Sequence, residues 1–138
     1  MEVCRRTLLI ADDDAGLRGT LQDVFESHFE VLTACDGREA LDVLATREAD
    51  LALFDVQMGD VSGLDVVQTL RHDRRMLPCT LMTARPTDDV LRKAATFGID
   101  PVLTKPFGIA AVISAVGRVL MASYGPEAVP AGMLPAKN

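Results

Sequence analysis

The sequence predicts an α/β fold in which helices cover both faces of a parallel five-stranded sheet. Short apolar runs alternate five times with longer stretches of helical period. The apolar runs are nearly continuous rather than alternating with polar residues, which is typical of parallel strands buried on both faces. A chain of 138 residues with 49% hydrophobic residues suits a single domain with a substantial core.

Each apolar run is rich in Leu, Ile, Val or Phe and is expected to form a strand. The strands are predicted at 7–11, 30–34, 51–55, 79–83 and 102–104. The intervening stretches carry apolar residues three and four positions apart, as Leu17, Leu21 and Val24 show in the first of them. Helices are predicted within 15–29, 37–48, 63–73, 87–98 and 109–122.

The predicted domain covers residues 5–122. Residues 123–138 are rich in Pro, Ala and Gly, and we expect them to form a flexible tail or linker with no second domain after it.

The last predicted helix has two faces of different character. Its inward stripe is expected to consist of Ile109, Val112, Ile113, Val116 and Leu120. The other side offers the small residues Ala110, Ala111, Ser114 and Gly117. This pattern fits either a helix packed in a small core or a surface for a partner, such as a second copy in a homodimer.

Composition excludes several classes of protein. The net charge is −6 and no basic stripe is present, so direct binding of nucleic acid is not expected. No run approaches the roughly 20 apolar residues of a membrane span. The three cysteines form no CxxC pair, which favours buried or idle thiols in a reducing compartment. We therefore expect a cytoplasmic protein.

Polar residues gather where the predicted strands end. Ligands of open α/β sheets bind at the carboxyl ends of the strands, which lie along one edge. The residues at these ends are Asp12, Asp13, Asp14, Asp55, Thr83 and Lys105. Taken singly, Asp14 fits a helix cap, Asp12 and Asp13 fit solvated loop charges, and Lys105 fits an ordinary surface charge. Their joint presence in an otherwise apolar sheet favours a functional site.

The chemistry of these groups points to phosphoryl transfer. Crowded carboxylates repel one another unless a cation joins them, and Mg²⁺ prefers oxygen ligands. A carboxylate such as that of Asp55 can act as a nucleophile and form an aspartyl phosphate. An ammonium and a hydroxyl, as in Lys105 and Thr83, can hold the remaining phosphoryl oxygens.

From Arg6 to Met121 the chain resembles the response-regulator receiver domain of two-component signalling, and in particular the single-domain chemotaxis regulators. The resemblance rests on four stretches in the family's order: "ADDDAGLR", "LALFDVQMGDVSGLDV", "LMTA" and "LTKPF". The second contains the family pattern D-x-x-M-P-x-x-x-G, with Asp55, Met58 and Gly63 in place. The resemblance as a whole implies a flavodoxin-like, doubly wound (βα)5 fold with strand order 2-1-3-4-5.

The resemblance also implies roles for individual residues. Asp55 would accept a phosphoryl group from a histidine kinase or a histidine phosphotransfer protein, and the phosphorylated domain would alter its contact with a downstream protein. Mg²⁺ or Mn²⁺ would be bound by Asp13, Asp55 and the main-chain carbonyl of Gln57, with Asp12 acting mostly through a bound water. Thr83 and Lys105 would contact the phosphoryl group. The Lys105–Pro106 bond would be cis. Such a protein catalyses its own phosphorylation and dephosphorylation without being a turnover enzyme.

Two positions depart from the family pattern. Gly59 stands where the family usually has proline, which predicts a looser loop. Val102 replaces the aromatic residue that usually precedes the lysine by three positions, so the usual rotating ring is absent.

Two other functions stay open at this point. A module that keeps the fold for interaction or scaffolding, without switching, is slightly favoured by Val102. A conventional phosphatase or phosphotransferase is disfavoured, because "DVQ" lacks the second aspartate of a D-x-D pair. The complete set of polar strand-end residues favours the phosphorylation switch.

Overall fold

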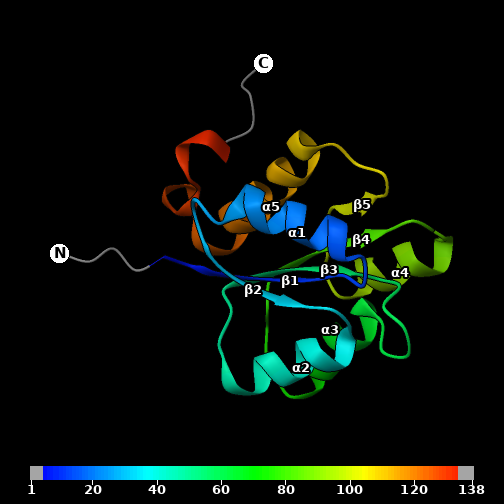
Figure 1. Ribbon diagram of the computed structural model, residues 1–138. Coiled ribbons are helices and arrows are strands. Elements are labelled where there is room, and N and C mark those ends of the chain that lie inside the picture. The colour runs from blue at the N-terminus through cyan, green and yellow to red at the C-terminus, as the bar shows by residue number, and fades with distance from the viewer. Residues whose placement is uncertain (1–4, 134–138) are drawn as a thin grey trace.

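The sheet has the predicted architecture in the computed structural model, which describes residues 5–133. Five parallel strands lie in the order β2-β1-β3-β4-β5 (Figure 1). Their bounds agree with those expected from the sequence: β1 Thr7–Ala11, β2 Glu30–Ala34, β3 Leu51–Asp55, β4 Cys79–Thr83 and β5 Val102–Thr104. The flavodoxin-like, doubly wound prediction is confirmed.

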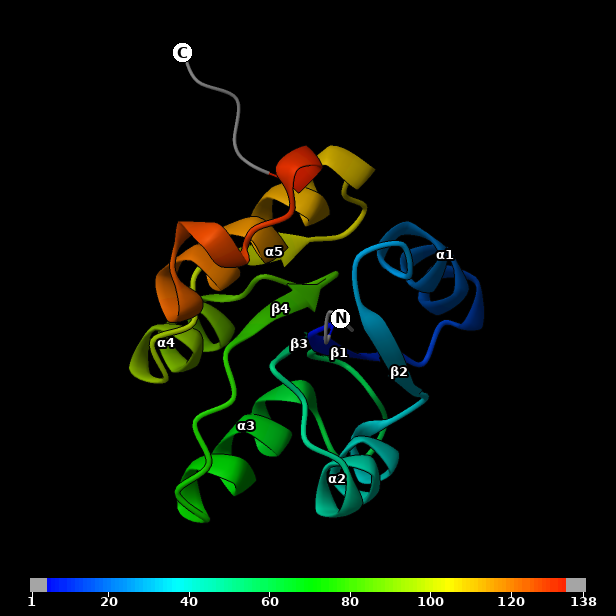
Figure 2. The same cartoon turned by 90° about the vertical axis from the view of Figure 1, so that its left-hand side faces the viewer.

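Five helices cover the two faces of the sheet. They are α1 Ala15–Phe25, α2 Gly37–Thr46, α3 Gly63–His72, α4 Asp88–Thr96 and α5 Ile109–Tyr124. In Figure 2, α1 and α5 lie on one side of the sheet and α2 and α3 on the other. The two core clusters show the same division, since α1 and α5 share one and α2, α3 and α4 share the other.

Side-chain caps fix where four of the helices begin. Asp14, Asp36 and Thr87 each accept hydrogen bonds from backbone N–H groups in the first turn of α1, α2 and α4. Ser62 and Asp65 form a reciprocal capping box at the start of α3. These first turns follow the carboxyl ends of the strands, so capping also orders the rim on which the strand-end residues lie.

The C-terminal segment differs from the expected flexible tail. The last helix extends to Tyr124, and two 3-10 turns follow at Pro126–Ala128 and Ala131–Met133. Val129 and Met133 are buried in the cluster shared by α1 and α5. The linker prediction is therefore wrong for residues 123–133, because these two apolar side chains anchor the segment. Residues 134–138 lie outside the described residues.

The faces of α5 also need correction. Ile109 was expected to point inward but is 44% exposed, because it forms the first residue of the helix. Gly117 was expected on the open side but is buried. A Cβ at this position would lie 2.6 Å from the carbonyl oxygen of Met133. Part of the small-residue face is thus covered by the chain's own C-terminal turns, whereas Ala110 and Ala111 stay exposed. Within residues 5–133, no helix has the length and apolar character needed to cross a membrane.

Candidate functional site

Three carboxylates gather at the carboxyl ends of β1 and β3. Asp12 and Asp13 follow β1, and Asp55 is the last residue of β3. One oxygen from each of these side chains lies within 4.8 Å of those of the other two. Asp12 and Asp55 are 0% and 3% exposed, whereas Asp13 is exposed. The cluster therefore combines two buried acids with one that faces solvent.

Backbone and side-chain donors hold Asp12 in place. Its Oδ1 atom accepts a hydrogen bond from the backbone N–H of Asp14 at 2.9 Å. Its carbonyl oxygen accepts one from the Arg18 guanidinium at 2.8 Å. Asp14 itself caps α1, as the sequence predicts, through bonds from the N–H groups of Gly16 and Leu17. The run of three aspartates thus divides into two site carboxylates and one helix cap.

Lys105 lies between the two buried acids. Its Nζ atom is 2.9 Å from Asp12 Oδ2 and 3.2 Å from Asp55 Oδ2. Its backbone N–H donates to the carbonyl oxygen of Thr83 at 2.8 Å, which ties the lysine to the end of β4. The following peptide bond to Pro106 is cis, as expected from the family resemblance. One ammonium is therefore shared by two carboxylates.

The environment changes the acidity of both partners. Burial, followed by the nearby charge of Asp12, raises the pKa of Asp55 from 3.8 to about 6, although Lys105 acts in the opposite direction. Burial of Lys105 opposes its charge, but its hydrogen bond to Asp12 and the two neighbouring carboxylates raise its pKa above the ordinary value. One ammonium therefore does not offset the cost of ionising Asp55.

The hydroxyl of Thr83 both donates and accepts a hydrogen bond. Thr83 is 0% exposed, and its Oγ1 donates to Gln57 Oε1 at 3.0 Å. The same oxygen accepts a hydrogen bond from the backbone N–H of Arg85 at 2.9 Å. Gln57 also contacts Asp55, because its backbone N–H donates to Asp55 Oδ1 at 3.3 Å. Thr83 and Asp55 are thus joined through one intervening residue.

Two glycines shape the loop after Asp55. Gly59 has a φ of 72°, a left-handed conformation that glycine adopts readily and proline cannot. A proline at position 59, which the family usually has, could not adopt this backbone conformation. A Cβ on Gly63 would lie 2.5 Å from the carbonyl oxygen of Asp55, so the start of α3 packs directly on the phosphoacceptor candidate.

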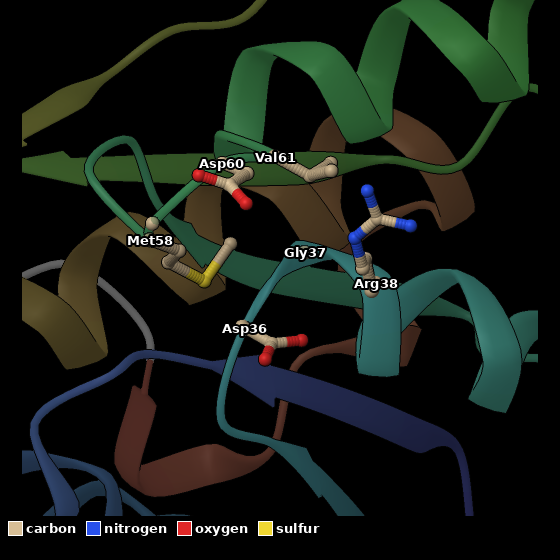
Figure 3. Close-up of a pocket in the computed structure, with 7 residues that line it drawn as sticks. Asp36, Gly37, Arg38, Met58, Asp60 and Val61 are labelled. Atoms are coloured by element: carbon tan, nitrogen blue, oxygen red, sulfur yellow. The ribbon is translucent and has the colours of Figure 1, made fainter.

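This loop also borders a pocket at the start of α2. Figure 3 shows Met58, Asp60 and Val61 of the loop facing Asp36 and Arg38 at the start of α2. Gly37 and Gly59 complete the lining, and a Cβ added to Gly59 would meet open space. The pocket is therefore formed by the loop after Asp55 and by the start of α2.

Val102 and the cysteines lie apart from the acidic cluster. Val102 lines a separate hollow between α4 and β5 together with Leu91, Ala94 and Pro101. Cys35 is an exposed free thiol, and burial raises the pKa of the free thiol of Cys79 to about 12. The burial of Cys79 agrees with the expectation of buried or idle thiols, while Cys4 lies outside the described residues.

The structure brings together most of the residues that the sequence singled out. Asp12, Asp13 and Asp55 form one cluster, and Lys105 contacts two of them. Thr83 is joined to them through Gln57, which the sequence selected only for its main-chain carbonyl. Its side-chain bond to Thr83 was not anticipated, because no local pattern links residues 26 positions apart. The Arg18 contact was also missed, although the first turns of α1 were expected at this edge.

The family model for the response regulator receiver domain matches residues 8–117 of this chain. The alkaline phosphatase synthesis transcriptional regulatory protein PhoP of Bacillus subtilis is 32% identical over 119 residues, which is 86% of this chain and 50% of that protein. The chain spans about half the length of this and other curated relatives that it matches.

Solved receiver domains have the same fold. The Francisella response regulator 1452 receiver domain aligns with a TM-score of 0.77 and 27% identity, covering 86% of this chain and 98% of that one. The chemotaxis protein CheY4 of Vibrio cholerae aligns with a TM-score of 0.77 and 26% identity, covering 85% and 100%. Together with the match over residues 8–117, these likenesses establish that the chain belongs to the response regulator receiver domain family.

Proposed function

We propose that this receiver domain is a switch controlled by phosphorylation of Asp55. The phosphoryl group would come from a histidine kinase or a histidine phosphotransfer protein, and the phosphorylated domain would bind a downstream protein differently. The observation that carries the proposal is the shared ammonium of Lys105, held 2.9 Å from Asp12 and 3.2 Å from Asp55 beside a third carboxylate.

The acidic cluster fits a divalent metal. All three side chains offer oxygen ligands that lie close together, which is the donor set that Mg²⁺ and Mn²⁺ prefer. Asp13 and Asp55 would bind the ion with the Gln57 carbonyl oxygen, and Asp12 would act mostly through a water. When bound, the metal offsets negative charge on the transferring phosphoryl group.

The chain's own residues have distinct parts in the transfer. An Asp55 carboxylate oxygen attacks phosphorus and forms the O–P bond, while the P–N bond breaks and its electron pair leaves with the donor imidazole. Lys105 compensates part of the charge on Asp55 before transfer and part of the charge on the phosphoryl oxygens afterwards. Thr83 then donates its hydroxyl proton to a phosphoryl oxygen. In self-catalysed dephosphorylation, water attacks phosphorus, the bond to the Asp55 oxygen breaks, and inorganic phosphate leaves. The domain acts on its own side chain rather than on a separate substrate, so we do not class it as a turnover enzyme.

The readout of this switch is proposed to differ from that of most family members. Val102 has no ring to reorient, and its branched side chain is stiff. The response is therefore expected in Thr83, in the loop after it and at the start of α4. A cytoplasmic location and a homodimer through the part of α5 around the exposed Ala111 and the half-buried Ser114 are further parts of the proposal.

Labelling by a small acyl phosphate in the presence of Mg²⁺ tests the phosphoacceptor. Intact mass measurement should show one added phosphoryl group on the wild-type chain and on Asp14→Asn, which keeps a good helix cap. The Asp55→Asn variant should gain none. Equal labelling of Asp55→Asn and wild type would refute the assignment, and a folded wild type that is not labelled would favour the scaffold interpretation.

A further inference from the structure

Thr83 is already engaged in the absence of a phosphoryl group. A hydroxyl carries one proton, and that of Thr83 is donated to Gln57 Oε1 at 3.0 Å. The backbone N–H of Arg85 holds the same oxygen at 2.9 Å, so the hydroxyl is fixed from both sides. A phosphoryl oxygen on Asp55 can therefore receive the Thr83 proton only if the bond to Gln57 breaks.

We infer that the side-chain amide of Gln57 is a latch, which holds the hydroxyl proton of Thr83 in competition with a phosphoryl group on Asp55. This inference rests on the proposed function, since it assigns Gln57 as a positioning residue for Thr83. The position of Gln57 suits this role, because its backbone N–H also donates a hydrogen bond to Asp55 Oδ1 at 3.3 Å. Gln57 thus contacts both the phosphoacceptor and the group that responds to it.

The two ends of the latch differ in their exposure. Thr83 is 0% exposed and cannot exchange its bond for one to bulk water. Gln57 is an exposed residue, so its amide can be hydrated when it is released. Opening the latch therefore exchanges a neutral hydrogen bond for a charge-assisted one at Thr83, while Gln57 is solvated. The latch weakens the response to phosphorylation without preventing it.

Beryllium fluoride, a phosphoryl analogue, provides the test on the full chain with Mg²⁺, and backbone amide signals report its binding. The Gln57→Met variant keeps the length of the side chain but lacks the carbonyl acceptor. It should bind the analogue about fivefold more tightly, the equivalent of one neutral hydrogen bond of about 1 kcal/mol. Gln68→Met, at an exposed position on α3, is the matched control and should bind like wild type.

A double-mutant cycle separates the latch from a general effect of the substitution. In a Thr83→Val background, which removes the hydroxyl, Gln57→Met should leave the affinity for the analogue unchanged. Before the analogue is added, the Thr83 methyl signal should move in Gln57→Met and stay in place in Gln68→Met. This signal reports the bond itself rather than the stability of the fold.

Each remaining result counts against the inference. Unchanged or weaker binding by Gln57→Met would overturn the latch while leaving the proposed function intact, provided that wild type binds through Asp55. A fivefold gain that persists with Thr83→Val would also overturn the latch. If the folded wild type binds no analogue, or Asp55→Ala binds it equally well, the proposed function fails and the latch fails with it.

Discussion

Replacing Asp55 by asparagine should stabilise the metal-free protein at neutral pH. Asparagine resembles the protonated form of the carboxyl group in size and polarity, and it removes the charge that burial and Asp12 disfavour. Asp55 is 3% exposed, and its pKa is raised from 3.8 to about 6. The ionised side chain is therefore less stable in the folded protein than in the unfolded chain.

The size and the pH dependence of this effect follow from the two pKa values. At pH 7, above both values, ionisation of Asp55 costs the fold up to about 3 kcal/mol. We expect a gain of about 1–3 kcal/mol in the free energy of unfolding, because Asp55→Asn also gives up the contact with Lys105. As the pH falls from 6 to 4, wild type becomes protonated at this site and the difference should disappear.

Urea unfolding with a metal chelator, repeated between pH 4 and pH 7, measures this difference. Asp60→Asn is the control, because it removes the same charge from an exposed position in the same loop and should change stability by less than about 0.5 kcal/mol. The reasoning is refuted if Asp55→Asn is no more stable than wild type at pH 7, or if its advantage is as large at pH 4.

Other predictions follow from the same site and from the C-terminal turns. Millimolar Mg²⁺ should raise the melting temperature of wild type, and this rise should be smaller in Asp13→Asn. A wild-type melting temperature that does not change with Mg²⁺ would contradict a metal site at the three acids. Gly63→Ala should lower the free energy of unfolding by about 1–3 kcal/mol, because its Cβ would lie 2.5 Å from the Asp55 carbonyl oxygen, and an unchanged urea midpoint would refute this. Gly117→Ala should displace the turn around Met133, whose carbonyl oxygen is 2.6 Å from the added Cβ, and faster amide exchange confined to residues 126–133 would show it.

The strands were predictable because their burial leaves a strong pattern. A strand covered on both faces is mostly apolar along its length, so "LALFD" and "CTLMT" could be bounded from the sequence. The candidate site followed from the same pattern, because the carboxyl ends of parallel strands share one edge. That rule places Asp12, Asp55 and Lys105 together although they are far apart in the sequence.

The C-terminal turns were not predicted because their composition resembles that of a linker. Proline and glycine punctuate "YGPEAVPAGM", and this pattern is as common in flexible segments as in tight turns. The spacing of Val129 and Met133, four residues apart, was the available signal. Their burial against Gly117 also explains why this small residue of α5 does not lie on an open surface.

The charges of the site explain why a metal could be inferred when the bond between Gln57 and Thr83 could not. When all three acids are ionised, Asp12, Asp13 and Asp55 carry three negative charges, and Lys105 supplies one positive charge. The remainder of two negative charges in a partly buried cluster is matched by one divalent cation.

Charge can be counted from residue types alone, once the topology brings the residues together. A hydrogen bond between two neutral side chains depends on rotamers and on the path of a loop, which here includes a glycine with positive φ two residues after Gln57. For this reason the chemistry of the site can be predicted from the sequence. The hydrogen bonds of the unphosphorylated site can be found only from the three-dimensional structure.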